Sequence, residues 1–171
     1  MTMKYRYILL LSLISLNSCD SPNGTSSSNP TSWKKHEAIL PGQDSLFYGK
    51  TYLPVYSRIY QQHKNKTYNL TVTVSLRNIS LTDTVYVLTA EYFNTEGDFI
   101  RSYFSKPIQL KPLETADIII DETDNEGGTG GNFIFNWAVK DKNVEPLFEA
   151  VMISTTGQQG MSFLTRGIII Q

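Results

Sequence analysis

Side chains for thiol or imidazole chemistry are almost missing from this sequence. Its 171 residues contain one cysteine, Cys19, and two histidines, His36 and His63. A zinc site needs several cysteine or histidine ligands at short spacing, and a disulfide needs two cysteines. The G-x-S-x-G turn of a nucleophilic serine does not occur either. We therefore expect no metal, no cofactor and no histidine-dependent hydrolase.

An excess of charge of one sign is also lacking. Lys and Arg total 15 against 16 Asp and Glu, which gives a net charge of −1 without a long run of either sign. Proteins that bind nucleic acid through its phosphates present a basic face, so we expect no nucleic-acid partner. Hydrophobic residues make up 40% of the chain, enough to fill one core. The composition indicates a single domain with dispensable ends.

The N-terminus lacks the ~20 apolar residues of a membrane-spanning helix. In residues 1–19, Lys4 and Arg6 precede a shorter apolar run, Ile8 to Leu16. A positive start followed by a short apolar run is typical of a secretory signal peptide. A short N-terminal core helix is the alternative.

The end of that segment, Leu16-Asn17-Ser18-Cys19, resembles a bacterial lipobox, in which the cysteine is lipidated and becomes the first mature residue. Several acyl chains on Cys19 would hold the protein stably on a membrane. We therefore expect an exported bacterial lipoprotein with its domain outside the cytoplasm. Asp20 resembles an inner-membrane retention signal in enterobacteria only, so both the inner and the outer membrane stay open. An unmodified cysteine near an ordinary cleavage point is the alternative.

Residues 20–32 are rich in Ser, Asn, Thr and Pro and contain no large apolar side chain. Nothing in this stretch could offset the entropy of ordering it, so we expect a solvated tether. A leading segment, residues 33–46, follows, and residues 47–171 form the expected single domain.

Strict alternation is the clearest pattern in the body of the chain. In Thr67 to Arg77, Tyr68 and every second residue to Leu76 are apolar, and those between are polar. Such alternation predicts a strand with one buried and one solvated face. Further strands are expected at 85–93, 99–105, 116–121, 133–140, 147–154 and 163–170, with residues 108–115 leading into the strand at 116–121. Short strands at this spacing predict an all-β, antiparallel, immunoglobulin-like β-sandwich, with a small β-barrel as the alternative.

Antiparallel strands place successive connections at alternate ends of a sandwich. One end would collect the loops 61–66, 94–98, 122–132 and 155–162, and the other 78–84, 106–112 and 141–146. Binding residues concentrate on loops held by a rigid scaffold. The candidate binding residues are therefore Asp124, Asn125, Glu126, Gly127, Gly128, Gly130, Gly131, Asn132, Gly157, Gln158, Gln159 and Gly160. Ordinary polar turns are the alternative.

Four glycines crowd into residues 127–131. A phosphate-binding P-loop would need a following Lys and a helix, but the aromatic stretch Phe133 to Trp137 follows instead. An EF-hand loop starting at Asp121 fails because Glu126 stands where glycine is required. We expect these glycines to permit turns with positive φ and the close approach of two strands.

Several segments together resemble a bacterial family known as domain of unknown function 3124. They are Tyr56 to Tyr60, Asn69 to Asn78, Tyr92 to Tyr103, Lys106 to Glu122, Gly127 to Phe133 and Glu149 to Gly167. The resemblance covers roughly residues 47–171 and implies a small exported protein, often a lipoprotein. It implies no activity, substrate or catalytic residue.

Three functions remain open at this point. The first is a lipid-anchored, non-catalytic binding or assembly module that meets an envelope protein or glycan through its loops. The second is an envelope enzyme that uses loop carboxylates on glycan or peptide. The third is a structural accessory that pairs through the edges of its sheets.

Overall fold

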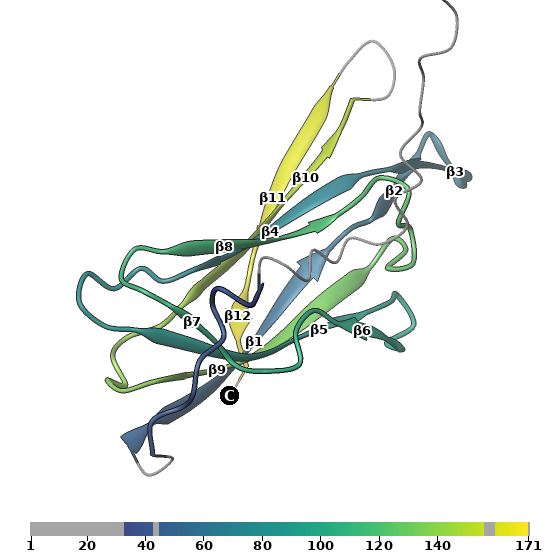
Figure 1. Cartoon of the computed structure of the whole chain (residues 1–171). Helices are drawn as coiled ribbons and strands as arrows, with labels where there is room; N and C mark the ends of the chain where they lie inside the picture. Colours follow the sequence, from purple (N-terminus) through teal and green to yellow (C-terminus); the bar gives the residue numbers. More distant parts are fainter. Residues whose placement is uncertain (1–32, 43–44, 156–159, 171) are drawn as a thin grey trace, which may run out of the picture.

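The structure, a computed structural model, describes residues 33–42, 45–155 and 160–170. Twelve strands occur in these residues, and ten of them build two layers that pack face to face (Figure 1). Their bounds are β1 Phe47–Val55, β2 Arg58–Gln61, β3 His63–Asn69, β4 Thr71–Arg77, β5 Val85–Phe93, β6 Phe99–Ser102, β7 Ile108–Leu110, β8 Thr115–Ile120, β9 Gly131–Val139, β10 Leu147–Ser154, β11 Met161–Arg166 and β12 Ile168–Ile169.

Two sheets form the layers, and a separate hairpin extends from them. The six-stranded sheet has the order β12-β1-β9-β5-β6, with β7 also paired to β5. The four-stranded sheet has the order β11-β10-β4-β8, and β2 pairs with β3 alone. All pairs in the described residues are antiparallel, and neither sheet closes on itself. The fold is the expected antiparallel β-sandwich and not a barrel.

The core lies between the two sheets and follows the alternation of their strands. On β4, Val72, Val74 and Leu76 point inward and have no solvent exposure. Phe135 of β9 and Phe148 of β10 stack across the layers with ring centroids 4.2 Å apart. Each such side chain stabilises the fold by roughly 1.5–3 kcal/mol when it is fully buried. These contacts tie the two sheets together.

The prediction of one continuous strand from Thr67 to Arg77 is wrong, because the strand is divided at Leu70. Residues before Leu70 form β3 and pair with β2, while residues after it form β4 and pair with β8 and β10. The Leu70 N–H donates to the Ser57 carbonyl instead of to either sheet. The expected loop 61–66 is likewise mostly strand, because the β2–β3 turn is confined to Gln62, with φ of 59°. Alternation continues through Leu70, so the change of partner leaves no trace in the periodicity.

Two other expected strands are also broken. The edge that pairs with β5 is interrupted between β6 and β7 by residues 103–107, so the stretch 99–105 is a strand only as far as Ser102. The stretch 163–170 crosses from the four-stranded sheet to the six-stranded sheet at Gly167. A Cβ on Gly167 would lie 2.7 Å from Thr51 Cγ2, so only glycine fits where the chain changes layers.

The leading segment is an integral part of the sandwich. Trp33 is 7% exposed and packs against Phe104 with ring centroids 5.1 Å apart. Glu37 forms a β-bridge with Ile108 on β7. The chain then runs across the outer face of the six-stranded sheet, where Leu46 joins a small second core. Within the described part of the chain, we find no helix of sufficient length and apolarity to span a membrane.

Candidate functional site

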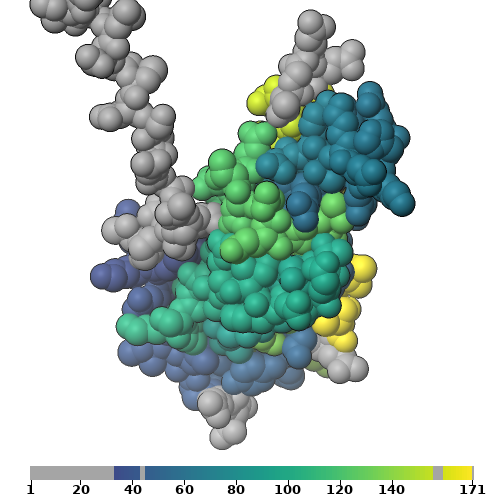
Figure 2. Space-filling view, turned by 90° about the vertical axis from the view of Figure 1, so that its right-hand side faces the viewer, coloured from purple at the N-terminus to yellow at the C-terminus, as the bar shows by residue number. Residues whose placement is uncertain are grey.

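One end of the sandwich gathers the connections on which the expected binding loops lie. The register pairs Phe93 with Asn132 and Val72 with Ile120, so the 94–98 turn and the 121–130 loop leave the sheets at the same end. Ser154 and Met161 place the β10–β11 connection there too. Figure 2 shows the turn and the loop side by side, with the β2–β3 hairpin projecting next to them.

The second expected loop group holds only in part. The connections 78–84, 111–114 and 141–146 lie at the opposite end. Residues 106 and 107 do not, because β6 and β7 follow one another along the same edge of β5. Gly157, Gln158 and Gln159 lie outside the described residues, and Gly160 is exposed.

Arg101 on β6 holds the acidic part of the 121–130 loop. Its Nη1 donates to Asp124 Oδ2 at 2.8 Å, its Nη2 donates to Asp124 Oδ1 at 3.2 Å, and it also pairs with Glu126. Burial alone would lower the pKa of Arg101, but the hydrogen bond to Asp124 and the nearby acidic charges raise it overall. The guanidinium also lies over the ring of Tyr92, 5.8 Å from its centroid. Two of the expected binding carboxylates are therefore held by the protein itself.

Thr95 joins the turn to the glycine run. Its Oγ1 donates to the Gly127 carbonyl at 3.0 Å and accepts from the Gly130 N–H at 3.0 Å. The Gly128 carbonyl accepts from Ser57 Oγ at 3.2 Å and from the Arg58 N–H at 3.2 Å. These backbone groups all form hydrogen bonds within the protein. The 121–130 loop is therefore a joint that connects the two sheets and the β2–β3 hairpin.

The glycines allow other parts of the chain to come close. A Cβ on Gly127 would lie 1.8 Å from Tyr92 Oη, and one on Gly131 would lie 2.9 Å from the Gly127 carbonyl oxygen. Gly128 has φ of +71°, where L side chains are strained. Gly130 differs, because a Cβ there would meet Thr95 Cγ2 only at an ordinary 3.5 Å. Three of the four glycines are thus required by geometry.

Tyr92 lies beneath this loop, inside the core. The side chain has no solvent exposure and stacks on Phe133 with ring centroids 4.8 Å apart. Burial raises the pKa of the Tyr92 phenol well above its ordinary value, although the Ser57 hydroxyl acts in the opposite direction. The phenol therefore stays protonated over the physiological range and is not placed to act as a base.

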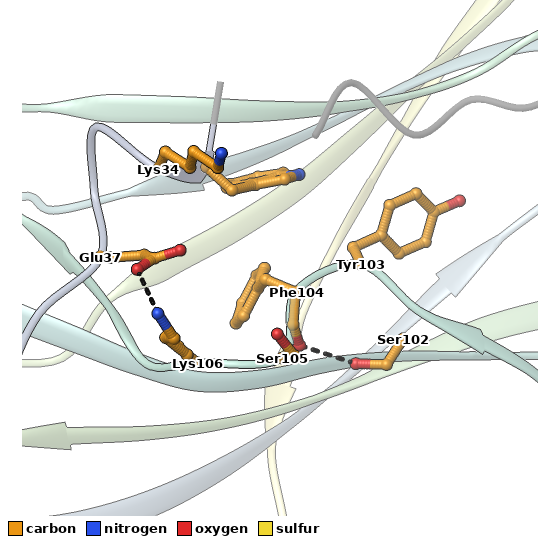
Figure 3. A pocket seen from close by; sticks show the side chains of 8 residues that line it. Lys34, Glu37, Ser102, Tyr103, Phe104, Ser105 and Lys106 are labelled. Atoms are coloured by element: carbon orange, nitrogen blue, oxygen red, sulfur yellow. Dashed lines mark hydrogen bonds and ion pairs between the residues drawn. The ribbon is translucent and has the colours of Figure 1, made fainter. Parts of the chain in front are cut away.

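A cavity of about 410 Å³ lies between the leading segment and the link from β6 to β7 (Figure 3). Its lining is formed by Trp33, Lys34, Glu37, Ser102, Tyr103, Phe104, Ser105 and Lys106. Glu37 is its only acidic residue, and Glu37 Oε2 accepts from Lys106 Nζ at 2.9 Å. The cavity has the volume of a small-ligand site but offers no pair of carboxylates for hydrolysis.

The outer face of the four-stranded sheet carries an apolar row. The register places Ile119, Thr73, Val151 and Leu164 side by side on β8, β4, β10 and β11. The three large side chains are 40%, 38% and 55% exposed, respectively, and Ile153 beside them is 41% exposed. Grouped apolar side chains on a surface are typical of protein contact sites.

The next row on the same face is polar, and its side chains already form hydrogen bonds and ion pairs with one another. Ser75 Oγ donates to Asp117 Oδ1 at 2.7 Å, and Arg166 Nη2 donates to Glu149 Oε1 at 3.1 Å. Arg77 pairs with the same glutamate, Nε to Oε2 at 3.3 Å. The apolar row is thus bounded on one side by charged groups that are already paired.

Strand β11 is one of the two edges of this sheet at which the apolar row ends, and it carries the most exposed side chain of the row, Leu164. Among the described residues it pairs with β10 alone. Its Ser162, Leu164 and Arg166 are all exposed. An edge of this kind offers backbone N–H and C=O groups that another strand can use.

Comparison with known proteins gives a family but no activity. Residues 48–170 match the family described as "Protein of unknown function (DUF3124)". The chain belongs to this family. No curated protein matches the chain. The match confirms the resemblance seen in the sequence.

One solved structure is similar to this DUF3124 protein in fold. It is described as "Crystal Structure of Thermotoga maritima 1070" and is 7% identical, with a TM-score of 0.45. The similarity covers 70% of this chain and 92% of the other. A likeness of that strength carries no argument about function.

The sequence indicates part of the loop end of this DUF3124 protein but not the residues that hold the loop in place. It singled out Asp124 and the glycines, but not Arg101, Thr95 or Tyr92, which hold them. No local pattern marks these three, since each acts on residues more than twenty positions away. The free edge at β11 was also missed, because an edge is defined by the absence of a neighbour. In the described residues, no group of three or more His, Cys, Asp or Glu side chains could hold a metal ion.

Proposed function

We propose that this protein is a non-catalytic assembly module of the bacterial cell envelope, anchored to a membrane by lipid on Cys19. It acts by taking up an extended strand from a protein partner at the free edge of β11. The single observation that carries the proposal is that the most exposed side chain of the apolar row, Leu164, lies on this edge strand.

Strand addition explains why the two features belong together. Backbone hydrogen bonds at a free edge supply affinity, and side chains on alternate positions supply specificity. A strand added at β11 turns every second side chain to the outer face, and one of these lies beside Leu164, at the end of the row that contains Val151 and Ile119. The partner strand therefore carries an apolar side chain at that position.

The loop end fits this role less well than the sheet does. The carboxylates of Asp124 and Glu126 are engaged by Arg101, and the carbonyls of Gly127 and Gly128 are engaged by hydroxyl and amide donors. A ligand would have to displace these contacts before it could use the same groups. The loop end therefore supports the sandwich, and the sheet edge supports the partner.

Site-specific crosslinking in membrane vesicles tests the proposal. A cysteine is introduced by Leu164→Cys in the full chain and labelled with a photoreactive thiol reagent, with Ile119→Cys as the matched control at the opposite edge of the same row. The expected result is a protein adduct at position 164 that is at least about tenfold more abundant than at position 119. Equal adducts, or none at position 164, would contradict strand addition at β11.

Hydrogen exchange gives an independent measurement on the unmodified full chain. Amides of Ser162, Leu164 and Arg166 should exchange slowly in vesicles and quickly in dilute detergent, where the partner dissociates. Amides of β8 should not change. Exchange at β11 that is fast under both conditions would argue against the proposal.

The anchor has its own test. Cys19→Ser removes the only thiol that can be lipidated. The variant should appear in the soluble fraction, while the wild-type protein stays with the membranes. A variant that remains membrane-bound in high salt would show that lipid on Cys19 is not the anchor.

A further inference from the structure

We infer that the strand added to β11 is β11 of a second copy of this chain, paired antiparallel about Leu164. This inference rests on the proposed function and names its partner. The pairing would join the four-stranded sheets of two copies into one continuous eight-stranded sheet.

The phase of the hydrogen bonds shows which residues face the free edge. The Gly167 N–H donates to the Phe148 carbonyl at 2.8 Å, so this pair is of the hydrogen-bonded kind. Such pairs alternate along an antiparallel ladder. Given the register of β10 and β11, Thr165 and Phe163 bond to β10. Ser162, Leu164 and Arg166 therefore turn their N–H and C=O groups outward.

Only one symmetric register pairs all three of these residues with one another. With the two-fold axis at Leu164, the two Leu164 residues face each other and Ser162 faces Arg166 of the second copy. All outward backbone groups are then paired, and each copy keeps its ion pair between Arg166 and Glu149. An axis at Arg166 would oppose two guanidinium groups, which is destabilising. Axes at Ser162, Phe163 or Thr165 would each place at least one of the three residues opposite a residue outside β11.

The apolar row continues across this axis. In each copy, Ile119, Val151 and Leu164 lie in one row that ends at the edge. Pairing brings the two rows end to end and covers the two leucines, which are the most exposed members of the row, at 55%. A two-fold contact of this kind uses the same surface on both copies and closes on itself. This contact by itself therefore gives a dimer.

The edge is short, so the dimer should be weak and depend on concentration. Stable protein interfaces bury roughly 800 Å² per partner, more than one short strand pair with a few side chains provides. Confinement of both copies to one membrane raises their effective concentration in the way a linker does. Membrane anchoring and self-pairing thus reinforce each other.

A disulfide at the two-fold axis tests the register directly. Facing residues of a hydrogen-bonded pair have Cα atoms about 5.5 Å apart, within the range that a disulfide spans. Mild oxidation of the full-length Leu164→Cys variant in vesicles should therefore produce a covalent dimer. The Ile119→Cys variant and the wild-type chain, which reports on Cys19, should stay monomeric. Absence of the dimer at position 164, or equal dimer in all three, would overturn the inference.

A charge at the axis provides the test without a covalent bond. Leu164→Arg places two like charges opposite each other, while Ile119→Arg places the same charge on the other edge strand. In analytical ultracentrifugation of the full chain in detergent, the first variant should raise the dimer Kd at least about tenfold and the second should leave it unchanged. A wild-type protein that stays monomeric at all concentrations would also refute self-pairing.

The two proposals fail in different ways. If photocrosslinking at position 164 captures a different protein and no disulfide dimer forms, the assembly role stands and self-pairing is wrong. If neither an adduct nor a disulfide forms at position 164, both are wrong.

Discussion

The chain covers the outer face of the six-stranded sheet but leaves the outer face of the four-stranded sheet exposed. On the six-stranded sheet, Tyr86 and Ala138 are 7% and 0% exposed because the leading segment packs over them through Leu40 and Leu46. On the four-stranded sheet, Val151 and Ile153 are about as apolar but remain exposed. Apolar side chains on an outer face are therefore not by themselves unusual in this fold. The difference is that one face has its cover within the described chain, and the other face ends at a free edge.

We infer from this difference that one sheet serves stability and the other serves association. The covered sheet is completed by the chain's own N-terminal segment, so its role is stability. The open sheet has its polar row paired internally and its apolar row available, so it is the surface that we assign to a partner. Substitutions on the two faces should therefore differ in whether they change folding or association.

The largest expected effect is on the covered side. Trp33→Ala removes the indole that fixes the start of the leading segment against Phe104 and the core. The free energy of unfolding should fall by about 3–5 kcal/mol in chemical denaturation. Lys34→Ala, at the exposed neighbouring position, should change it by less than about 0.5 kcal/mol. Similar values for both variants would mean that the leading segment does not complete the fold.

A matched pair on the two outer faces gives the direct test. Leu46→Ala, under the cover of the six-stranded sheet, should lower the free energy of unfolding by about 2 kcal/mol or more. Ile153→Ala, on the open sheet, should change it by less than about 0.5 kcal/mol when measured on the monomer in dilute detergent. The comparison would break if Ile153→Ala were as costly as Leu46→Ala, since the open face would then have a cover within the chain.

The joint between the sheets should respond to glycine replacement by position. Gly128→Val forces a β-branched residue to φ of +71° and places a Cβ 2.5 Å from Thr95 Oγ1, so we expect a loss of about 1–3 kcal/mol. From the glycine run alone, Gly130→Val is also expected to destabilise the domain more than a surface substitution does. The ordinary 3.5 Å contact at Gly130 now makes a smaller loss the expected result. Thermal unfolding of both variants measures the difference, and equal losses would show that this geometry is not the cause.

The smallest effect concerns the phenol beneath the joint. Burial raises the pKa of Tyr92 above its unfolded value of about 10, so the unfolded chain loses this proton first as pH rises. The resulting contribution to stability is intact below about pH 10 and is lost progressively above it. Tyr92→Phe should therefore flatten the decline in stability above pH 10 and change it by less than about 1 kcal/mol at pH 7. Parallel alkaline declines for the wild type and the variant would exclude Tyr92 as the cause.

Local sequence patterns predict much of the fold. Particular residues show where such patterns fail. The alternation from Thr67 to Arg77 correctly predicts which side chains are inward, because successive side chains of a strand point to opposite faces wherever the strand lies. The same alternation hides the break at Leu70, since a change of partner strand does not disturb the period. The glycine run is recognisable as a place of close approach, but Tyr92, which approaches, lies on a distant strand.

The sequence by itself determined the β character and the inward face of a regular strand such as β4, because these follow from neighbours along the chain. Tertiary structure alone decided which strands pair, where the chain changes sheets at Gly167, and how Arg101 holds Asp124. It also decided which apolar outer face is covered and which is open. These properties depend on hydrogen bonds and packing between residues far apart in sequence, and no local periodicity records them.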